Sequence, residues 1–266
     1  MDQDPSVQNA EQIPGVGAGA TVTSVGRVLD ILEAFQRVRK PVSLTELADI
    51  TGIPKSSCHA IVRTLIARGY LYSLSRPRSL YPTRRIYDVA VETQAHDPIV
   101  QQVTPLLERL RDNSRETVIL GKRQHDAVIY LQVFESQHAI RYSAKPGHFK
   151  PMHSSAIGKA LLGSLKEAEL RTQLSGRTFP AVTPDTITGA DALVKDIVDS
   201  RRRGYFVTRG ENVPDVWAVA TYLSLRSETL AVAIAGPRHR MEHNVVEHAQ
   251  VLLATCSLIS RQARGA

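Results

Sequence analysis

The sequence predicts a mixed α+β protein built in two parts, and three observations carry that prediction. Residues 43–69 form two short amphipathic segments joined by a glycine turn. Two strand-like runs with a basic turn between them follow directly. From residue 99 onward, segments with helical apolar periodicity bracket segments of strand character. A length of 266 residues with 42% hydrophobic residues suits one large domain or two modest ones with real cores.

The N-terminal segment, the lack of long apolar runs and the two cysteines indicate in which compartment the protein is expected. Residues 1–20 are acidic and rich in Gly and Ala, which predicts a disordered tail and lacks the parts of a signal peptide. No run approaches the roughly 18 apolar residues that a membrane span needs. Cys58 and Cys256 fall on apolar helix faces in different parts, so we expect small buried residues rather than a disulfide or a metal pair. These features favour a cytoplasmic protein with no membrane partner.

The basic part opens with three predicted helices. Ser43, followed three residues later by Glu46, is a capping box that begins the second helix. Gly52 suits the end of that helix, and Pro54 suits the first turn of the third. The first helix lies upstream, and its expected apolar face consists of Val25, Val28, Leu29, Leu32 and Phe35.

The third helix carries its apolar residues on one side only. They recur at helical spacing as Cys58, Ile61, Val62, Leu65 and Ile66. Ser56, Ala60 and Arg63 point the opposite way, and Ser57 and His59 lie on the flanks. A helix-turn-helix presents such a polar face to the DNA major groove. An ordinary surface helical hairpin gives the same local pattern, so the neighbouring segments decide between the two.

Those neighbouring segments favour a winged helix-turn-helix. Residues 70–72 and 80–81 are strand-like, and the turn between them carries Arg76 and Arg78, which is the outline of a β-wing. Residues 21–92 hold 11 Lys or Arg against 6 Asp or Glu, more than twice the net positive charge per residue of the remainder. The whole chain has a net charge of +7. A basic balance suits a polyanionic partner.

The second part is predicted to be an α+β sensor-like domain. A linking helix at 83–93 with Ile86, Val89 and Ala90 on its apolar side leads to a boundary at 96–98. Helices bracketing mostly antiparallel strands give this architecture. The helices are expected at 99–113, 152–162, 167–174, 190–203 and 242–261, and the strands at 117–120, 127–134, 139–142, 205–208, 216–223 and 230–235.

The sequence motifs of known enzyme sites are incomplete in this chain. Gly158-Lys159 lacks the rest of a phosphate loop, because His153 and Ala160 stand where Gly and Ser or Thr are needed. His153 beside Ser154 has no third orienting group, and neighbours at a helix start rarely point at one another. The nine histidines show no metal-ligand spacing. We therefore expect no catalytic residues, no metal, no cofactor and no enzymatic activity.

The chain resembles the IclR family of bacterial transcriptional regulators over essentially all of residues 22–263. The ordered motifs that carry the resemblance are SVGRVLDIL at 24–32, LTELADITGIPKSSCHAIVRTLIARGYL at 44–71, ETVILG at 116–121, PMHSSAIGKALL at 151–162, TPDTIT at 183–188, RRRGYFV at 201–207 and AIAGPRHRM at 233–241. The resemblance implies a winged helix-turn-helix DNA-binding domain at 21–82, a linker helix at 83–96 and a GAF-like effector-binding domain at 97–266. It also implies homodimers or tetramers on a palindromic double-stranded DNA operator of a catabolic operon.

The expected DNA-binding residues lie on the helix-turn-helix and the wing. Base contacts specify a sequence and phosphate contacts position the protein. Groove contacts are expected from Ser56, Ser57, His59 and Arg63. Phosphate contacts are expected from Arg27, Lys55, Arg76 and Arg78, and Ser43 and Thr45 complete the DNA-binding set. Ala60 stands where the family usually has Arg, so the operator sequence of relatives cannot be carried over.

The family places its effector pocket between one sheet face and the loop entering the helix at 152–162. Ser154 and Ser155 lie at that helix N-terminus, where free N–H groups attract a carboxylate, although both serines could simply cap the helix. At the pocket this chain differs from the residues that are common in the family. Ala218 replaces a Cys, Ala233 and Ala235 replace Ser, and Asp215 replaces a Gly. The pocket is therefore expected to be roomy and apolar.

A roomy apolar pocket suits an aromatic or hydrophobic carboxylate as effector, hence a role in aromatic catabolism. Trp217 is expected to point away from the pocket, because strand neighbours alternate faces. The expected ligand-binding residues are Tyr142, Ser155, Ala156, Ile157, Thr208, Val216, Ala218, Ala233 and Ala235. Two functions remain open, an effector-responsive transcription factor and a sensor module whose helix-turn-helix mediates protein contacts.

Overall fold

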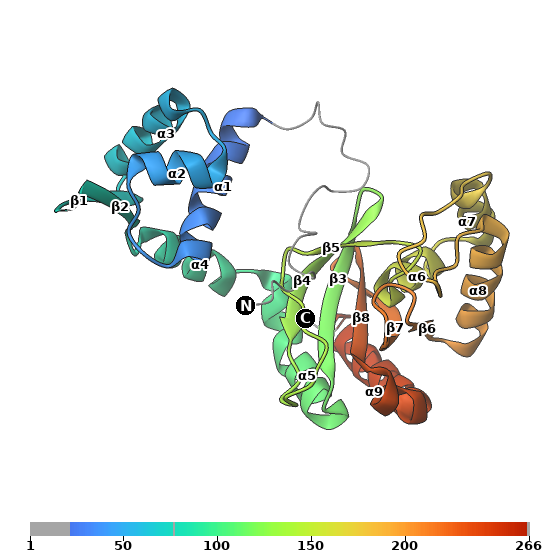
Figure 1. Cartoon of the computed structure of the whole chain (residues 1–266). Helices are drawn as coiled ribbons and strands as arrows, with labels where there is room; N and C mark the ends of the chain where they lie inside the picture. The colour runs from blue at the N-terminus through green and yellow to red at the C-terminus, as the bar shows by residue number, and fades with distance from the viewer. Residues whose placement is uncertain (1–21, 77, 265–266) are drawn as a thin grey trace. The chain divides into compact units, whose positions relative to one another are not determined.

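The computed structural model describes residues 22–76 and 78–264. The expected tail at 1–20 lies outside the described residues. The described chain divides into two compact units, and the boundary along the sequence lies between Asp97 and Pro98 (Figure 1). Among the described helices, none combines the length and apolar content that a membrane span requires.

The N-terminal unit is a three-helix head with a two-stranded wing, as predicted, followed by the linker helix. Strands β1 and β2 pair antiparallel, with Tyr72 opposite Tyr81. The core of the unit gathers residues from all three helices and both strands, among them Ile31, Leu47, Cys58 and Leu71. Its elements are α1 (Thr23–Val38), α2 (Leu44–Thr51), α3 (Lys55–Ala67), β1 (Leu71–Ser75), β2 (Arg78–Pro82) and α4 (Arg85–Ala95).

The predicted capping box forms at the start of α2. The Ser43 backbone N–H donates to Glu46 Oε2 at 2.7 Å, and the Glu46 N–H donates to Ser43 Oγ at 3.2 Å. Gly52 ends α2 at φ 66°, in the left-handed region that favours glycine. These local signals fix both ends of α2 and so the angle at which α3 leaves the turn.

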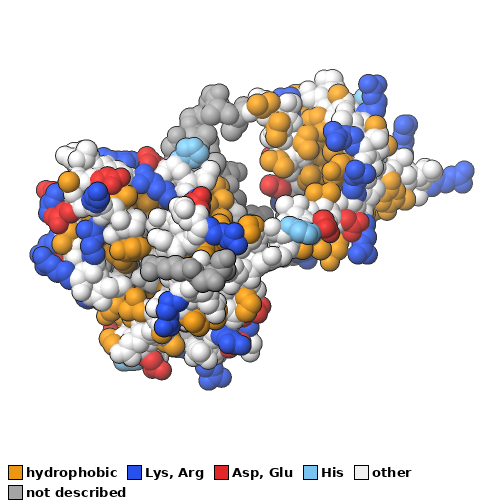
Figure 2. Space-filling model, turned by 180° about the vertical axis from the view of Figure 1, so that it is seen from behind, with side chains coloured by type: hydrophobic (Ala, Val, Ile, Leu, Met, Phe, Trp, Pro, Cys, Tyr) orange, Lys and Arg blue, Asp and Glu red, His pale blue; other side chains and the backbone are white. Residues whose placement is uncertain are grey.

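The predicted apolar face of α1 is partly wrong. Phe35 is buried, but Val25 is 58% exposed and Leu29 is 54% exposed, while Ile31 and Ala34 lie in the core. Helix α1 has two apolar stripes, and only the stripe that faces α2 is covered. Hydrophobic side chains accordingly gather on one face of this unit in Figure 2. The linker helix α4 likewise has no buried residue among its described side chains.

The C-terminal unit confirms the α+β prediction. Among the described residues, six strands form one antiparallel sheet in the order β5-β4-β3-β8-β7-β6. Its elements are α5 (Pro98–Ser114), β3 (Thr117–Gln124), β4 (Ala127–Phe134), β5 (Phe149–Pro151), α6 (Ala156–Gly163), α7 (Glu167–Leu174), α8 (Ala190–Arg203), β6 (Phe206–Arg209), β7 (Val216–Leu225), β8 (Glu228–Pro237) and α9 (Arg238–Arg264).

Two predicted elements differ in the structure. Residues 139–142 do not form a strand, and β5 pairs with β4 instead. The segment is held by a side chain rather than by a ladder, because Thr117 Oγ1 donates to the Tyr142 carbonyl at 2.6 Å. The helix expected from residue 152 begins at Ala156, because Ser155 is its N-cap and accepts from the Gly158 N–H at 3.1 Å.

Helices cover both faces of the sheet (Figure 1). Helices α5 and α9 pack on one face, and α6 packs on the other with α8 behind it. Strand β8 shows the alternation: Leu230, Val232 and Ile234 join the α5–α9 core, whereas Ala231, Ala233 and Ala235 face α6. Small side chains on the α6 side leave space between this helix and the sheet.

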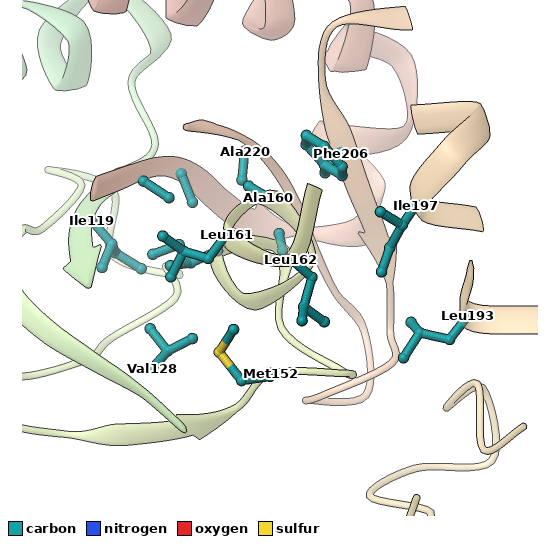
Figure 3. Packing of buried hydrophobic residues seen from close by; sticks show 14 of the residues in the cluster. Ile119, Val128, Met152, Ala160, Leu161, Leu162, Leu193, Ile197, Phe206 and Ala220 are labelled. Atoms are coloured by element: carbon teal, nitrogen blue, oxygen red, sulfur yellow. The ribbon is translucent and has the colours of Figure 1, made fainter. Parts of the chain in front are cut away.

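Helix α6 is buried on all sides. In Figure 3 its Ala160, Leu161 and Leu162 lie among apolar side chains from the sheet and from α8, including Ile119 and Ile197. A Cβ atom on Gly158 would lie 2.3 Å from the Met152 carbonyl oxygen. The start of α6 therefore sits against the turn that precedes it, and this contact sets the position of the loop beside the sheet.

Candidate DNA-contacting surface and effector cavity

The polar face of α3 is accessible. Ser56, His59 and Arg63 are exposed, and Ala60 lies among them without a polar group. Ser57 is half-buried, and its hydroxyl oxygen accepts from Arg27 Nη1 of α1 at 3.4 Å. The groove residues expected from the sequence therefore share one face of the helix, and Arg27 lies beside them.

The expected phosphate-contacting residues lie around α3. Lys55 begins α3 and is exposed, as are Arg76 in the wing turn and Arg78 at the start of β2. Thr45 is exposed on the first turn of α2. Ser43 already uses its hydroxyl in the capping box. All ten residues expected to bind DNA thus belong to the N-terminal unit. Ser43 is the one among them whose side chain is engaged in the capping box.

A small cavity lies between the start of α6 and the alanine face of the sheet; its internal volume is about 30 Å³, and about 390 Å³ of free space is counted when the open solvent at its mouth is included. The structure brings all nine residues expected at the ligand site around it. The lining residues are Ile119, Tyr130, Tyr142, Ser155, Ala156, Ile157, Thr208, Asn212, Val213, Val216, Ala218, Ala233 and Ala235. The wall contributed by β7 and β8 consists largely of alanine methyl groups.

Few polar groups face this cavity. The hydroxyls of Tyr130 and Tyr142 are hydrogen-bonded to each other, and burial raises the pKa of both phenols, so both are neutral near pH 7. Ser155 Oγ donates to the Pro151 carbonyl at 2.6 Å while it caps α6. The N–H groups of Ala156 and Ile157 belong to the first helical turn, which leaves them without an intrahelical acceptor. The cavity therefore offers donors at the start of α6 and an apolar wall opposite.

Sequence reasoning missed four lining residues, which are Ile119, Tyr130, Asn212 and Val213. Ile119 pairs with Ala233 across β3 and β8, so sheet register could have found it. Asn212 and Val213 lie in the irregular segment between β6 and β7, where no periodic signal exists. Trp217 points to the opposite sheet face, as expected, and its ring lies beneath Arg209 at 5.4 Å.

His153 does not act with the neighbouring serines. Its Nε2 is hydrogen-bonded to the Pro180 carbonyl at 3.0 Å, and its ring stacks on Phe179 at 4.9 Å between centroids. Burial is the main cause that lowers the pKa of this histidine, so the neutral ring is favoured. Among the residues described, no cluster of His, Cys, Asp and Glu suits a metal ion. The geometry gives His153 a packing role.

A buried ion-pair cluster lies on the other side of α6. Lys159 is 0% exposed, and its Nζ lies 2.6 Å from Glu211 Oε2 and 2.9 Å from Asp196 Oδ2. Burial is the main cause that raises the pKa of Glu211, while the Lys159 charge acts in the opposite direction. The cluster joins α6, α8 and the segment before Asn212, and so fixes one cavity wall.

A winged helix-turn-helix joined in one chain to a sheet domain with an internal cavity defines a class of transcriptional regulators with a DNA-reading head and a small-molecule sensor. Residues 24–75 match the IclR helix-turn-helix domain, and residues 91–261 match the domain described as bacterial transcriptional regulator IclR C-terminal. The chain belongs to the IclR family of bacterial transcriptional regulators.

Individual relatives agree with this assignment. The chain is 32% identical to the HTH-type transcriptional regulator BhcR of Paracoccus denitrificans, over 85% of this chain and 82% of that protein. It is 29% identical to the transcriptional repressor IclR of Escherichia coli, over 84% and 83%. The fold matches an IclR homolog from Microbacterium hydrocarbonoxydans complexed with 4-hydroxybenzoate, with a TM-score of 0.73, 22% identity, and coverage of 91% and 100%. These regulators confirm the expectation that the chain is not an enzyme.

Proposed function

We propose that this protein is a ligand-responsive, DNA-binding regulator of a catabolic operon, with an aromatic or hydrophobic carboxylate as its effector. The cavity carries this proposal, because its alanine wall suits a flat apolar ring and its donors gather at the start of α6. A homolog of the same fold that is complexed with 4-hydroxybenzoate supports an aromatic acid as the effector class. Residues 21–82 would bind DNA, 83–96 would transmit the signal and 97–266 would sense the effector.

Calorimetric titration tests the effector class. We expect benzoate and 4-hydroxybenzoate to bind at least about tenfold more tightly than glyoxylate or pyruvate, because a ring removes more apolar surface from water. Ala218→Leu would fill the half-buried end of the alanine wall and weaken the aromatic acids much more than the small ones. Tight binding of acids of glyoxylate size alone would contradict the proposed effector class.

The DNA partner is a palindromic operator bound by a dimer or tetramer of this chain. Exposed apolar residues on α1 and α4, including Val25, Leu29 and Tyr87, support self-association, since such surface is normally covered in an assembly. The polar face of α3 supports groove contacts, and the basic wing supports phosphate contacts. A mobility shift with the upstream intergenic DNA of the gene tests this, and a negligible shift at low salt would favour a protein-contact role for the helix-turn-helix.

Replacing both wing arginines, Arg76→Ala and Arg78→Ala, is expected to weaken binding to all DNA sequences alike. Each lost phosphate contact should lower the slope of log affinity against log salt by about 0.9, because fewer counterions are released. A matched control removes two exposed arginines from the C-terminal unit, Arg171→Ala and Arg202→Ala, with the same change in net charge. If the slope is the same in the wing variant and in this control, the two wing arginines do not contact DNA.

A further inference from the structure

Asn212 is a polar cavity residue that the resemblance to relatives does not assign. Its Nδ2 donates to Ser154 Oγ at 3.1 Å, and Ser154 is fully buried directly before the N-cap of α6. A carboxamide has a second N–H and a carbonyl oxygen, and neither forms another hydrogen bond within the described part of the chain. Asn212 therefore holds a spare donor beside the start of α6.

Thr208 gives the same region a second free group. It lies on β6, lines the cavity and is only 4% exposed. No hydrogen bond joins its hydroxyl to another described residue, and the hydroxyl is not among the fully enclosed polar atoms that lack a partner, which fits a group that faces the cavity. A hydroxyl that faces the cavity is available to donate to a ligand oxygen there.

The segment that carries Asn212 is held from several sides. Thr183 Oγ1 donates to the Gly210 carbonyl and Thr186 Oγ1 to the Glu211 carbonyl, both at 2.7 Å. The Glu211 carboxylate binds the fully buried Lys159 of α6. Three anchors thus fix the two residues before Asn212, and the carboxamide is held in place before any ligand enters.

We propose that Asn212 is a specificity-determining residue, whose carboxamide donates to the acid group of the effector and makes the cavity select carboxylates over neutral analogues. The inference rests on the proposed function and assigns a further residue to the effector site. Thr208 donates to the same acid group, and the Lys159–Glu211 ion pair positions the segment. The ligand ring then lies against the alanine wall formed by Ala218, Ala233 and Ala235.

The substitution Asn212→Asp tests this in the full chain. It keeps the size of the side chain but replaces a donor by a negative charge, and the Ser154 hydroxyl can reverse its role and donate to the new carboxylate. We expect wild-type protein to bind benzoate more tightly than benzamide. In the variant, benzoate affinity should fall by at least about tenfold because like charges face each other, while benzamide affinity should change much less.

Asn113→Asp is the matched control, because it adds the same charge at an exposed position on α5. Thermal unfolding of both variants checks that the fold is retained. If the ratio of benzoate to benzamide affinity changes equally in both variants, or in neither, the role of Asn212 is overturned and the effector class stands. If wild-type protein binds neither benzoate nor 4-hydroxybenzoate, the proposed effector class fails, and the role of Asn212 fails with it.

Discussion

The substitution Lys159→Met is expected to lower the free energy of unfolding of the C-terminal unit by about 3–5 kcal/mol, because it leaves buried carboxylates without their cation. Methionine fills the volume of the lysine stem but cannot pair with Glu211, which is almost fully buried. Trp217 is the single tryptophan of the chain and lies in this unit, so urea unfolding followed by its fluorescence gives the measurement.

The loss should depend on pH in a defined direction. Burial raises the pKa of Glu211 in the folded protein, and removal of Lys159 takes away the charge that opposes this. A carboxyl with a raised folded-state pKa stabilises the fold below its unfolded pKa, and this contribution is lost as pH rises through the folded pKa. The variant should therefore lose most stability near neutral pH and recover part of it in acid.

Two comparisons make this prediction specific to the buried cluster. Arg171→Ala breaks the exposed Arg171–Glu167 pair and should change the free energy of unfolding far less, because solvent screens that pair. Adding Glu211→Gln to Lys159→Met removes the unpaired charge and should restore part of the stability. Equal losses in the buried and exposed variants would mean that Lys159 does not stabilise the unit through its charge.

The substitution Gly158→Ala should destabilise the C-terminal unit by about 3 kcal/mol or more, through overpacking at the start of α6. The new Cβ would lie 2.3 Å from the Met152 carbonyl oxygen and 2.6 Å from Met152 Cα. These are backbone atoms, so a change of side-chain rotamer cannot relieve the contact. Displacement of α6 would also move Ala156 and Ile157, so benzoate affinity should fall together with the melting temperature.

Gly189→Ala is the matched substitution for this test. Gly189 precedes α8 at a negative φ, and a Cβ there would have no heavy atom within 4 Å. Its cost should stay within about 1 kcal/mol, since only an N-cap preference changes. A Gly158→Ala protein with wild-type melting temperature would show that the start of α6 can move away from the preceding turn at little cost.

The elements with strong local signals were predictable from the sequence. Helices α7 and α8 agree with the predicted ranges residue for residue, and α2 begins and ends where its capping box and glycine place it. The errors arose where tertiary contacts decide. Only one of the two apolar stripes of α1 meets a partner, and residues 139–142 are held by Thr117 instead of pairing as a strand.

Most cavity residues on strands and on α6 were predictable from the sequence, whereas those in the irregular segment between β6 and β7 were not. The family resemblance placed Ala218, Ala233 and Ala235 at the pocket, and strand alternation placed Trp217 on the opposite face. Asn212 depends on contacts with Thr183, Thr186 and Lys159, which are distant in sequence. A local sequence pattern contains no information about such long-range contacts. The position of the segment between β6 and β7, and of Asn212 within it, could therefore be found only from the structure.

The contrast between the two sides of the cavity bears on the redesign of this protein as a biosensor. Helix α6 tolerates no added atom at Gly158 or at Gly163, where a Cβ would lie 2.1 Å from the Phe206 ring. The facing strands instead line the cavity with alanine methyl groups, of which Ala218 is only half-buried. A mutant library aimed at new inducers should therefore keep α6 constant and begin on the strand side, at Ala218.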